Sequence, residues 1–251
     1  RALGADRVQA VTATSPSFPR GELEWAQRTA DFLGVAHRTV QTGEVEREAY
    51  ARNDGLRCYH CKVELYTVLS KVAAEAGADT VVLAGANADD AADFRPGLLA
   101  ADQLGVHNPL LEHRVAKDAV RAIARSLVPV VADRPAMACL SSRVAYGVRI
   151  TPDLLARIDR AERSVRTLGF DGVRVRHFGR RAAIEVASGD VDRLRSHPGL
   201  LDLLSDIRSL GWSEVVIDAD GYRSGSMNAT LVDRGVVAFS VDQIRRRHVR
   251  R

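Results

Sequence analysis

Three cysteines are the residues of this sequence whose type and spacing point most directly to chemistry. Cys58 and Cys61 form a C-x-x-C pair, and Cys139 lies far from them along the chain. An odd number of cysteines cannot pair completely within one chain, and a structural disulfide framework is uncommon in cytosolic proteins. Each of the three thiols is therefore a candidate for metal binding or redox chemistry.

Four interpretations of these cysteines stay open from spacing alone. A C-x-x-C pair at a helix start favours thioredoxin-like disulfide exchange, which leaves Cys139 unexplained. The three thiols together with His60 or His113 are typical of a structural zinc site. Three thiolates also suit a four-iron cluster whose fourth iron stays open to a non-protein sulfide. The fourth interpretation is three unrelated cysteines in a protein core.

A pair of arginines on a predicted strand forms the second candidate site. Segment 173–176 alternates apolar and basic residues, so Arg174 and Arg176 point to the same face of the strand. Two neighbouring guanidinium groups make a clamp for phosphate or carboxylate. Glu185, on the partner strand of the predicted hairpin, is placed to orient an arginine or to hold a ribose hydroxyl. The alternative is the solvent face of a half-buried hairpin.

Two glycine-containing segments add candidate positions for a metal ion and an anion. Segment 85–97 follows a predicted parallel strand, so Gly85 is expected at the carboxyl edge of the sheet, where α/β proteins bind ligands. Asp89 and Asp90 could hold Mg²⁺ beside a nucleotide. Segment 218–228 places Arg223 among glycines and serines after a strand, which suits contact with an oxyanion. A polar surface loop is the alternative for segment 85–97.

The elements that position these residues alternate between strands and helices in the first part of the chain. We expect strands at 8–14, 35–40 and 79–84 and helices at 21–33, 61–76 and 116–127. The first strand is expected to be buried. The third is expected to be buried on both faces, because its apolar run is continuous. Such alternation predicts an α/β fold with a parallel sheet flanked by helices.

The pattern changes near residue 150, which predicts a second, smaller α+β unit. Thr151 and Pro152 begin a helix that is expected to reach about residue 168. A β-hairpin at 173–187, helical stretches at 190–195 and 200–210 and a strand at 214–217 are expected to follow. We therefore expect two domains, residues 1–148 and residues 149–251.

The bulk composition is that of a globular protein with a basic surface. The chain has 251 residues, is 46% hydrophobic and carries a net charge of +4, so one large domain or two modest ones can form a core. The sequence has no apolar run of about 18 residues and no signal-peptide pattern, so we expect a cytoplasmic protein with no membrane partner. Its arginine-rich segments 174–181 and 245–251 suit anionic ligands, with a solvated surface as the alternative for the second.

Taken together, the candidate segments resemble the LarE-type sulfur insertases, which help to build the nickel-pincer cofactor of lactate racemase within the PP-loop ATP pyrophosphatase superfamily. The likeness covers nearly the whole chain. It rests on five segments in the family's order: RCYHCK, LAGANADDAADFRPG, ACLSSR with the trailing YG, VRVR with the later IEV, and DGYRSGSMN. The set is fairly specific, whereas no single segment would be.

The resemblance implies a PP-loop ATPase domain (1–148) followed by a small substrate and oligomerisation domain (149–251), in a homo-oligomer that is often a hexamer. ATP would adenylate a carboxylate of a pyridinium mononucleotide and release pyrophosphate, and sulfur would then displace AMP. One subgroup takes this sulfur from a protein cysteine. The other takes it from a sulfide carried by a [4Fe–4S] cluster that three cysteines bind. The cysteines of this chain match the cluster subgroup, which also implies a sulfide donor as a partner.

The same resemblance assigns roles to the residues at matching positions. Three residues would be catalytic and would bind the cluster: Cys58, Cys61 and Cys139. Lys62 would hold a substrate carboxylate. The substrate phosphate and its surroundings would be bound by Ser142, Arg143, Arg174, Arg176, Glu185 and Arg223. ATP and Mg²⁺ would contact Thr14, Gly85, Asp89 and Asp90. The adenine would lie near Thr12, Ala13 and Thr14.

One departure from the family accompanies this prediction. The glycine-rich S-G-G-x-D-S phosphate loop, expected before the first strand, is not in the sequence. We therefore expect an N-terminally incomplete version, which would lack the backbone N–H groups that cradle the ATP phosphates.

Two other functions remain as alternatives. The runner-up is a PP-loop tRNA thiolation enzyme, which also uses C-x-x-C plus a distant cysteine. The VRVR and GYRSGSMN segments match the small-molecule family instead, so nucleic acid is not the partner that we expect. A non-catalytic, zinc-stabilised binding module is the third possibility, and chelation would unfold it.

Overall fold

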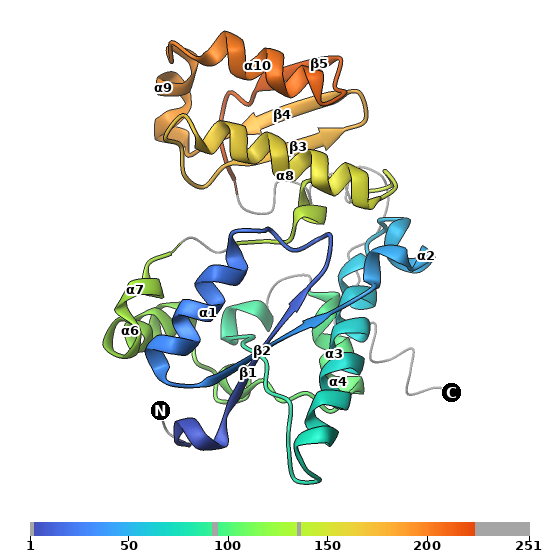
Figure 1. Ribbon diagram of the computed structural model, residues 1–251, viewed down its shortest axis with the longest axis vertical. Helices are drawn as coiled ribbons and strands as arrows, with labels where there is room; N and C mark the ends of the chain where they lie inside the picture. Colours follow the sequence, from blue (N-terminus) through green and yellow to red (C-terminus); the bar gives the residue numbers. More distant parts are fainter. Residues whose placement is uncertain (1–2, 92–94, 135–136, 224–251) are drawn as a thin grey trace.

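Two separate sheets organise the chain, one from its first part and one from its last part (Figure 1). The computed structural model describes residues 3–91, 95–134 and 137–223. In the first sheet, β1 (Gln9–Thr14) and β2 (Ala36–Gln41) pair in parallel along their whole length. In the second, β3 (Arg174–Phe178), β4 (Arg181–Glu185) and β5 (Glu214–Ile217) lie in that order, β3 antiparallel and β5 parallel to β4.

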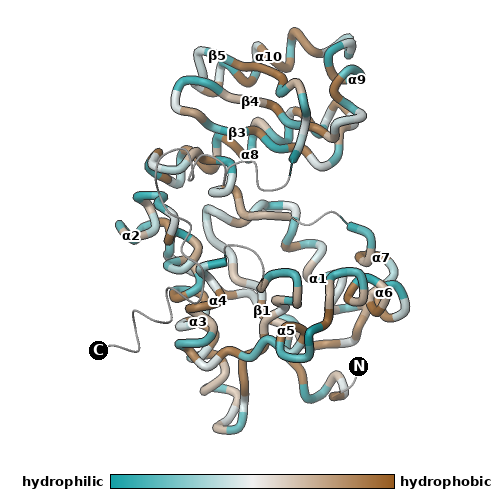
Figure 2. The backbone as a smooth tube through the Cα atoms, turned by 180° about the vertical axis from the view of Figure 1, so that it is seen from behind, coloured by the Kyte–Doolittle hydropathy of each residue, from teal (hydrophilic) through white to brown (hydrophobic). Residues whose placement is uncertain are grey.

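Helices flank the parallel strands on two sides. α1 (Glu22–Leu33) connects β1 to β2, and Gly34 ends it in the left-handed conformation, with φ of 67°. Figures 1 and 2 place α1, α6 (Lys117–Leu127) and α7 (Pro129–Ala132) to one side of the strands, and α3 (Arg57–Ala76) and α4 (Pro96–Gln103) to the other. The short helices of this part are α2 (Glu48–Ala51) and α5 (Pro109–Glu112).

The second sheet is covered by α8 (Pro152–Arg166), α9 (Val191–Arg195) and α10 (Leu200–Ser209) (Figure 1). Thr151 caps α8, because its Oγ1 accepts a hydrogen bond from the Leu154 N–H at 3.2 Å. The larger hydrophobic core lies between these helices and the sheet and includes Phe170 and Trp212. The same core continues into the first part of the chain through Val45 and Tyr50. The two parts therefore share buried apolar surface.

Residues 139–150 join the two parts. The single-turn 3₁₀ helix η4 (Leu140–Arg143) lies between them, and Val144 makes a parallel bridge to His177 of β3. Two backbone N–H groups of this stretch donate to the segment before α3: Gly147 to the Asn53 carbonyl at 3.0 Å, and Ile150 to the Ala51 carbonyl at 2.9 Å. The other 3₁₀ turns are η1 (Ala5–Arg7), η2 (Glu44–Glu46), η3 (Ala88–Ala91) and η5 (Ser188–Asp190).

The prediction of a doubly buried strand at 79–84 is wrong. Only an isolated bridge joins Leu83 to His107, supported by hydrogen bonds from the Ala84 N–H to the His107 carbonyl (2.8 Å) and from the His107 N–H to the Val82 carbonyl (3.0 Å). Val82 and Ala84 pack on the α3–α4 cluster, whereas Val81 and Leu83 are 60% and 51% exposed. Side chains alternate along an extended segment, and among the described residues only one of its faces is covered.

The remaining element predictions compare with the structure as follows. The parallel α/β arrangement, the hairpin, the helix that Thr151 starts and strand 214–217 are confirmed. β1 is a strand as predicted, but it is only half-buried. α3 begins at Arg57 rather than at residue 61, so it contains the whole C-x-x-C pair. Residues 92–94 and 224–228 of the two glycine-containing segments, and the arginine run 245–251, lie outside the described residues.

Candidate functional site

The C-x-x-C pair lies in the first turns of α3. Cys58 is exposed and Cys61 is partly buried, and both are free thiols. Residues three apart on a helix share a face, so the two sulfur atoms are neighbours on one side of α3. Gly97, in the first turn of α4, allows the close approach of the two helices here. A Cβ on Gly97 would lie 2.8 Å from Cγ of Lys62 and 3.6 Å from the carbonyl oxygen of Cys58.

Residues 139–143, which we call the cysteine turn, carry the third thiol. Cys139 precedes the first residue of η4 and is partly buried. The Leu140 N–H donates to the Ser17 carbonyl at 2.8 Å, just beyond the end of β1. The hydroxyl groups of Tyr50 and Ser141 share a buried hydrogen bond of 2.6 Å. These contacts hold the cysteine turn at the carboxyl edge of the first sheet, where α/β proteins bind ligands.

Arg57 connects the cysteine turn to the start of α3. Its Nη1 donates to the Ser141 carbonyl at 3.0 Å and to Oδ1 of Asn53 at 2.6 Å, and its Nη2 lies 4.0 Å from Sγ of Cys58. Burial lowers the pKa of Arg57, but attraction to Cys58 and Cys139 contributes to a net rise. The guanidinium therefore lies beside Cys58 and contacts the turn that carries Cys139.

The three thiols share one electrostatic neighbourhood. Burial raises the pKa of Cys61 to about 12, Lys62 lowers it, and Cys139, Glu44 and Cys58 add smaller increases. Within residues 3–91, 95–134 and 137–223, no group of three or more His, Cys, Asp or Glu side chains is arranged to hold a metal ion. Binding of one metal centre by all three cysteines therefore stays a prediction.

A buried carboxylate that the sequence reasoning missed lies beside these thiols. Glu44, after β2, is 2% exposed and accepts hydrogen bonds from the hydroxyls of Ser15 and Ser17, the latter at 2.8 Å. Ser15 and Ser17 follow β1 directly, as polar residues at the carboxyl end of a predicted strand. That position was the signal that could have identified them.

Asn53 is the second residue that sequence reasoning missed. It is fully buried and has a positive φ of 56°, which is uncommon outside glycine. Its Nδ2 donates to the carbonyls of Ala145 (2.8 Å) and Val148 (2.9 Å), and its Oδ1 accepts from Arg57. Asn53 thus fixes the cysteine-bearing end of α3 to the stretch that joins the two parts. No local sequence pattern marks this role.

Arg143 holds the cysteine turn from inside the protein. It is fully buried, and its Nε donates to Oε1 of Glu162 in α8 at 2.7 Å. Its Nη1 donates to the carbonyls of Ala138 (2.6 Å) and Cys139 (2.9 Å). These hydrogen bonds are all made to groups of the protein itself, so Arg143 positions the cysteine turn against α8. Direct contact between Arg143 and a substrate stays a prediction.

The arginine pair of β3 is buried beside the cysteine turn. Arg174 and Arg176 are 3% and 5% exposed, so the alternative of a solvent face is wrong. Arg176 forms an ion pair with Glu185 at 2.9 Å and donates to the carbonyl of Ser142 at 2.9 Å. Glu185 thus contacts an arginine of the pair, and its role in orienting that arginine toward a substrate stays a prediction. The Ser142 contact also brings the arginine pair next to the cysteine turn, although they are distant in sequence.

Arg174 makes a second set of contacts. Its guanidinium lies over the ring of Tyr222, 5.2 Å from the centroid, and Nη1 donates to the Val173 carbonyl at 2.8 Å. Burial, and then the like charge of Arg143, lower the pKa of Arg174. Both effects disfavour a charged guanidinium, and a bound anion would relieve them. Arg223 follows Tyr222 but is mostly exposed and pairs with Asp220 at 3.0 Å.

Of the predicted nucleotide residues, Thr14 ends β1, whereas Gly85, Asp89 and Asp90 lie in a separate segment that ends in η3. Thr14, at the end of β1, donates through Oγ1 to the Val40 carbonyl at 3.3 Å. Asp89 accepts from the Lys117 N–H at 2.7 Å, and Asp90 pairs with Arg95 at 2.9 Å. Gly85 is exposed. Asp89 therefore joins its segment to the start of α6, Asp90 pairs with Arg95, and contact of either carboxylate with Mg²⁺ or ATP stays a prediction.

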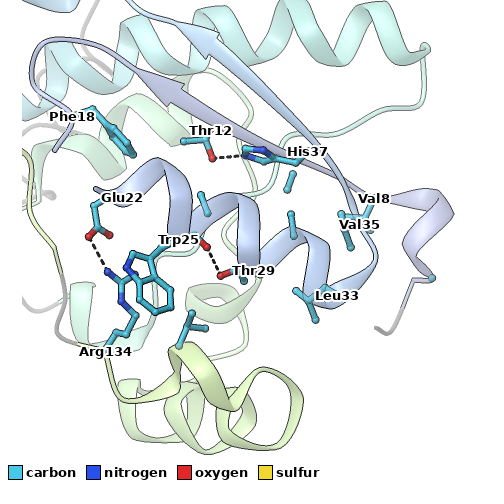
Figure 3. A pocket seen from close by; sticks show the side chains of 15 residues that line it. Val8, Thr12, Phe18, Glu22, Trp25, Thr29, Leu33, Val35, His37 and Arg134 are labelled. Carbon is cyan, nitrogen blue, oxygen red and sulfur yellow. Dashed lines mark hydrogen bonds and ion pairs between the residues drawn. The ribbon is translucent and has the colours of Figure 1, made fainter. Parts of the chain in front are cut away.

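A separate cavity of about 590 Å³ lies between β1, α1 and α7 (Figure 3). Trp25 forms part of its wall, with the Arg134 guanidinium 4.2 Å from the ring centroid. Thr12 shares a hydrogen bond of 2.9 Å with His37 inside it. Of the predicted residues only Thr12 lines this cavity. None of the three cysteines and neither arginine of the β3 pair does. The cavity therefore includes one residue predicted to lie near the adenine, whereas the residues predicted for sulfur transfer and phosphate binding lie elsewhere.

Comparison with known proteins identifies relatives over most of the chain. A pyridinium-3,5-bisthiocarboxylic acid mononucleotide synthase of Lactiplantibacillus plantarum is 32% identical over 95% of this chain and 85% of its own length. An uncharacterized protein of Synechocystis sp. is 40% identical over 91% of this chain and 85% of its own length. An uncharacterized protein of Methanocaldococcus jannaschii is 25% identical over 80% of this chain and 77% of its own length.

No family model matches the sequence. Among the described residues, no helix combines the length and the apolar character that crossing a membrane requires.

Proposed function

Because this chain belongs to the LarE-type family of the pyridinium-3,5-bisthiocarboxylic acid mononucleotide synthase, we propose that it inserts sulfur into a carboxylate of a pyridinium mononucleotide during nickel-pincer cofactor synthesis. The fold is the α/β fold of the PP-loop ATP pyrophosphatases. One observation carries the proposal: the cysteine turn lies between the C-x-x-C end of α3 and the buried arginine pair of β3. This arrangement supports sulfur chemistry close to an anion-binding pair.

The reaction that fits this arrangement is activation followed by substitution. ATP converts the substrate carboxylate into an acyl adenylate and releases pyrophosphate. Sulfide then attacks the acyl carbon, the carbon–sulfur bond forms and the bond to the AMP oxygen breaks. AMP leaves with the electron pair, and the product is a thiocarboxylate. Mg²⁺ would accompany ATP at the edge that carries Thr14, Gly85, Asp89 and Asp90.

The chain's own residues fit a [4Fe–4S] cluster by the chemistry of their donors. Cys58, Cys61 and Cys139 supply three free thiols in one neighbourhood, beside the cationic side chain of Arg57. Each thiolate would bind a different iron, so the three sulfurs need not meet at one point as they would around a single ion. When bound, the cluster supplies one open iron that can carry a sulfide. Lys62, on the next position of α3, would hold a substrate carboxylate nearby.

The arginine pair is the part of the site that would bind the substrate phosphate. Guanidinium groups bind phosphate through paired N–H donors, and burial strengthens the attraction. Arg174 is destabilised as a cation by burial and by Arg143, which an anion would offset. Glu185 holds the second guanidinium, and the Ser142 carbonyl links it to the cysteine turn. Arg223 would add a further cation from the surface.

The wider organisation follows the same proposal. Residues 1–148 would form the ATPase domain, and residues 149–251 would form the substrate and oligomerisation domain. The chain would work as a homo-oligomer, as a hexamer by family likeness, in the cytoplasm. A separate donor would supply the sulfide.

Anaerobic reconstitution of the whole chain with iron and sulfide tests this function. We expect uptake of four irons per chain, to be checked by iron counting and absorbance. With ATP and pyridinium-3,5-dicarboxylate mononucleotide, mass spectrometry should then show exchange of oxygen for sulfur, together with AMP and pyrophosphate. Cys139→Ser should abolish both iron uptake and exchange.

His60→Ala is the matched control, because His60 would be a ligand only in a zinc site of three cysteines and one histidine. It should leave iron uptake and exchange unchanged. Tight stoichiometric zinc that His60→Ala releases would overturn the cluster. Thiolation of tRNA without any reaction of the mononucleotide would overturn the substrate assignment.

A further inference from the structure

Arg57 is a buried cation in an unusual electrostatic position. Its side chain is 5% exposed, in the first turn of a 20-residue helix. Its hydrogen-bond acceptors are neutral, the Asn53 side-chain amide oxygen and the Ser141 carbonyl. Among the described residues no carboxylate forms an ion pair with Arg57. A guanidinium buried without an anion is expensive to keep charged, so an anion is expected nearby.

The groups that can supply this anion are the thiols. Sγ of Cys58 lies 4.0 Å from Nη2, and Ser141, whose carbonyl accepts from Nη1, belongs to the turn that carries Cys139. The ring of Tyr146 covers the other side, 5.2 Å from the guanidinium carbon. Its π face is also electron-rich and favours a cation. In the described part of the chain, the contacts of the Arg57 guanidinium are therefore neutral acceptors, an aromatic ring and a sulfur atom.

We propose that Arg57 is a positioning residue that supplies the counter-charge for the anionic sulfur site and holds the cysteine turn at the correct distance from α3. The inference rests on the proposed function and names a role within the same site. Three thiolates that carry an iron–sulfur core and a sulfide are negative overall, so a fixed cation beside them stabilises the assembly. The hydrogen bond to the Ser141 carbonyl also fixes the position of the cysteine turn relative to α3, because Ser141 belongs to the turn that carries Cys139.

The two parts of the role can be separated by substitution. Arg57→Gln removes the charge and most of the fork of donors. Arg57→Lys keeps the charge but cannot reach Asn53, Ser141 and Cys58 together, because an ammonium is a compact point charge. Arg52→Gln is the matched control, since Arg52 lies five residues earlier, at the end of α2, but its side chain is 58% exposed and pairs with Asp54. It removes one positive charge from the same segment without entering the site.

The first measurement needs no cluster. In metal-free Cys61→Ser protein, a short bis-maleimide should link Cys58 to Cys139, and peptide mass spectrometry should locate the link. We expect linking to be at least tenfold slower with Arg57→Gln and several-fold slower with Arg57→Lys. Arg52→Gln should leave the rate unchanged. Circular dichroism verifies that each variant is folded. If Arg57→Gln does not fold, the linking rate of Arg57→Lys tests the inference instead.

The second measurement is the reduction potential of the reconstituted protein. Reduction adds negative charge, so loss of the cation should disfavour it. Arg57→Gln should shift the reduction equilibrium at least tenfold, about 59 mV for a one-electron couple. Arg57→Lys and Arg52→Gln should stay near the wild-type potential. A purely structural residue would change cluster content without moving the potential.

The outcomes separate this inference from the proposed function. Folded Arg57→Gln with wild-type linking rate and wild-type potential overturns the role of Arg57. If the wild-type protein takes up no iron, the cluster in the proposed function fails, and the linking rates alone then decide whether Arg57 positions the cysteine turn. Equal linking rates for wild type, Arg57→Gln and Arg57→Lys would overturn the inference in that case.

Discussion

Replacement of Asn53 by alanine should destabilise the protein by about 5 kcal/mol. Two neutral hydrogen bonds, from Nδ2 to the Ala145 and Val148 carbonyls, contribute about 1 kcal/mol each, and the bond from the charged Arg57 contributes about 2 kcal/mol. The left-handed backbone at Asn53, φ 56°, costs an alanine about 1 kcal/mol more. This combined loss is at the upper end of single substitutions, because the side chain is buried and fully used.

Urea unfolding, followed by circular dichroism and by tryptophan fluorescence, measures this loss. Asn53→Gly should be about 1 kcal/mol less destabilised than Asn53→Ala, because glycine tolerates positive φ. Asn108→Ala is the matched control. Asn108 is also buried, but its Oδ1 has no partner and its Nδ2 makes a single long bond of 3.5 Å among the described residues. The Asn108→Ala cost should therefore be below about 1 kcal/mol.

A loss within about 1 kcal/mol of the Asn108→Ala control would refute the role of Asn53 as the link between α3 and the joining stretch. If Asn53→Gly is less stable than Asn53→Ala, the proposed cost of the left-handed backbone at residue 53 is refuted. Because two parts of the chain can unfold in separate steps, both probes should be followed. Coincident transitions are expected, since Asn53 ties the parts together.

Three further predictions concern the buried polar groups around the site. Glu185→Leu should cost about 3 kcal/mol, because Arg176 stays buried without its carboxylate; the added change Arg176→Met should recover most of this loss in a double-mutant cycle by urea unfolding. Tyr50→Phe should cost about 1 kcal/mol in thermal melts, because the buried hydroxyl loses its 2.6 Å hydrogen bond. Burial, with a smaller effect of a nearby arginine, lowers the pKa of His177 from 6.5 to about 4. The unfolded state therefore binds the proton first, and up to about 3 kcal/mol of stability present above pH 6.5 should be lost as pH falls toward 4. Urea midpoints at pH 7 and pH 5 measure this loss, and the difference should shrink in His177→Gln, whose amide oxygen can still accept the hydrogen bond from Trp212.

Local patterns in the sequence were sufficient for most helices and strands. Gly34 marked the end of α1, and Thr151 with Pro152 marked the start of α8, because caps and proline act through backbone groups within one turn. The alternation in segment 173–176 correctly placed Arg174 and Arg176 on one strand. Segment 79–84 was mispredicted because hydrophobicity alone does not say which neighbours cover a strand.

The sequence alone also supplied the types of group at the site. Three cysteines, a strand with two arginines and Glu185 were recognisable from identity and spacing, and the family likeness ordered them. What the spacing left open was whether the arginines faced water, and their exposed fractions of 3% and 5% answer that only in the folded chain.

Only the tertiary structure decided which of these groups meet. Contacts between residues far apart in sequence depend on how the helices and sheets pack, and no local pattern encodes them. The bonds from Arg57 to the Ser141 carbonyl and from Arg176 to the Ser142 carbonyl bring α3, the cysteine turn and β3 together. Asn53 makes that meeting possible through an unusual backbone angle and a buried amide, and both have a physical reason only once the two parts of the chain are packed.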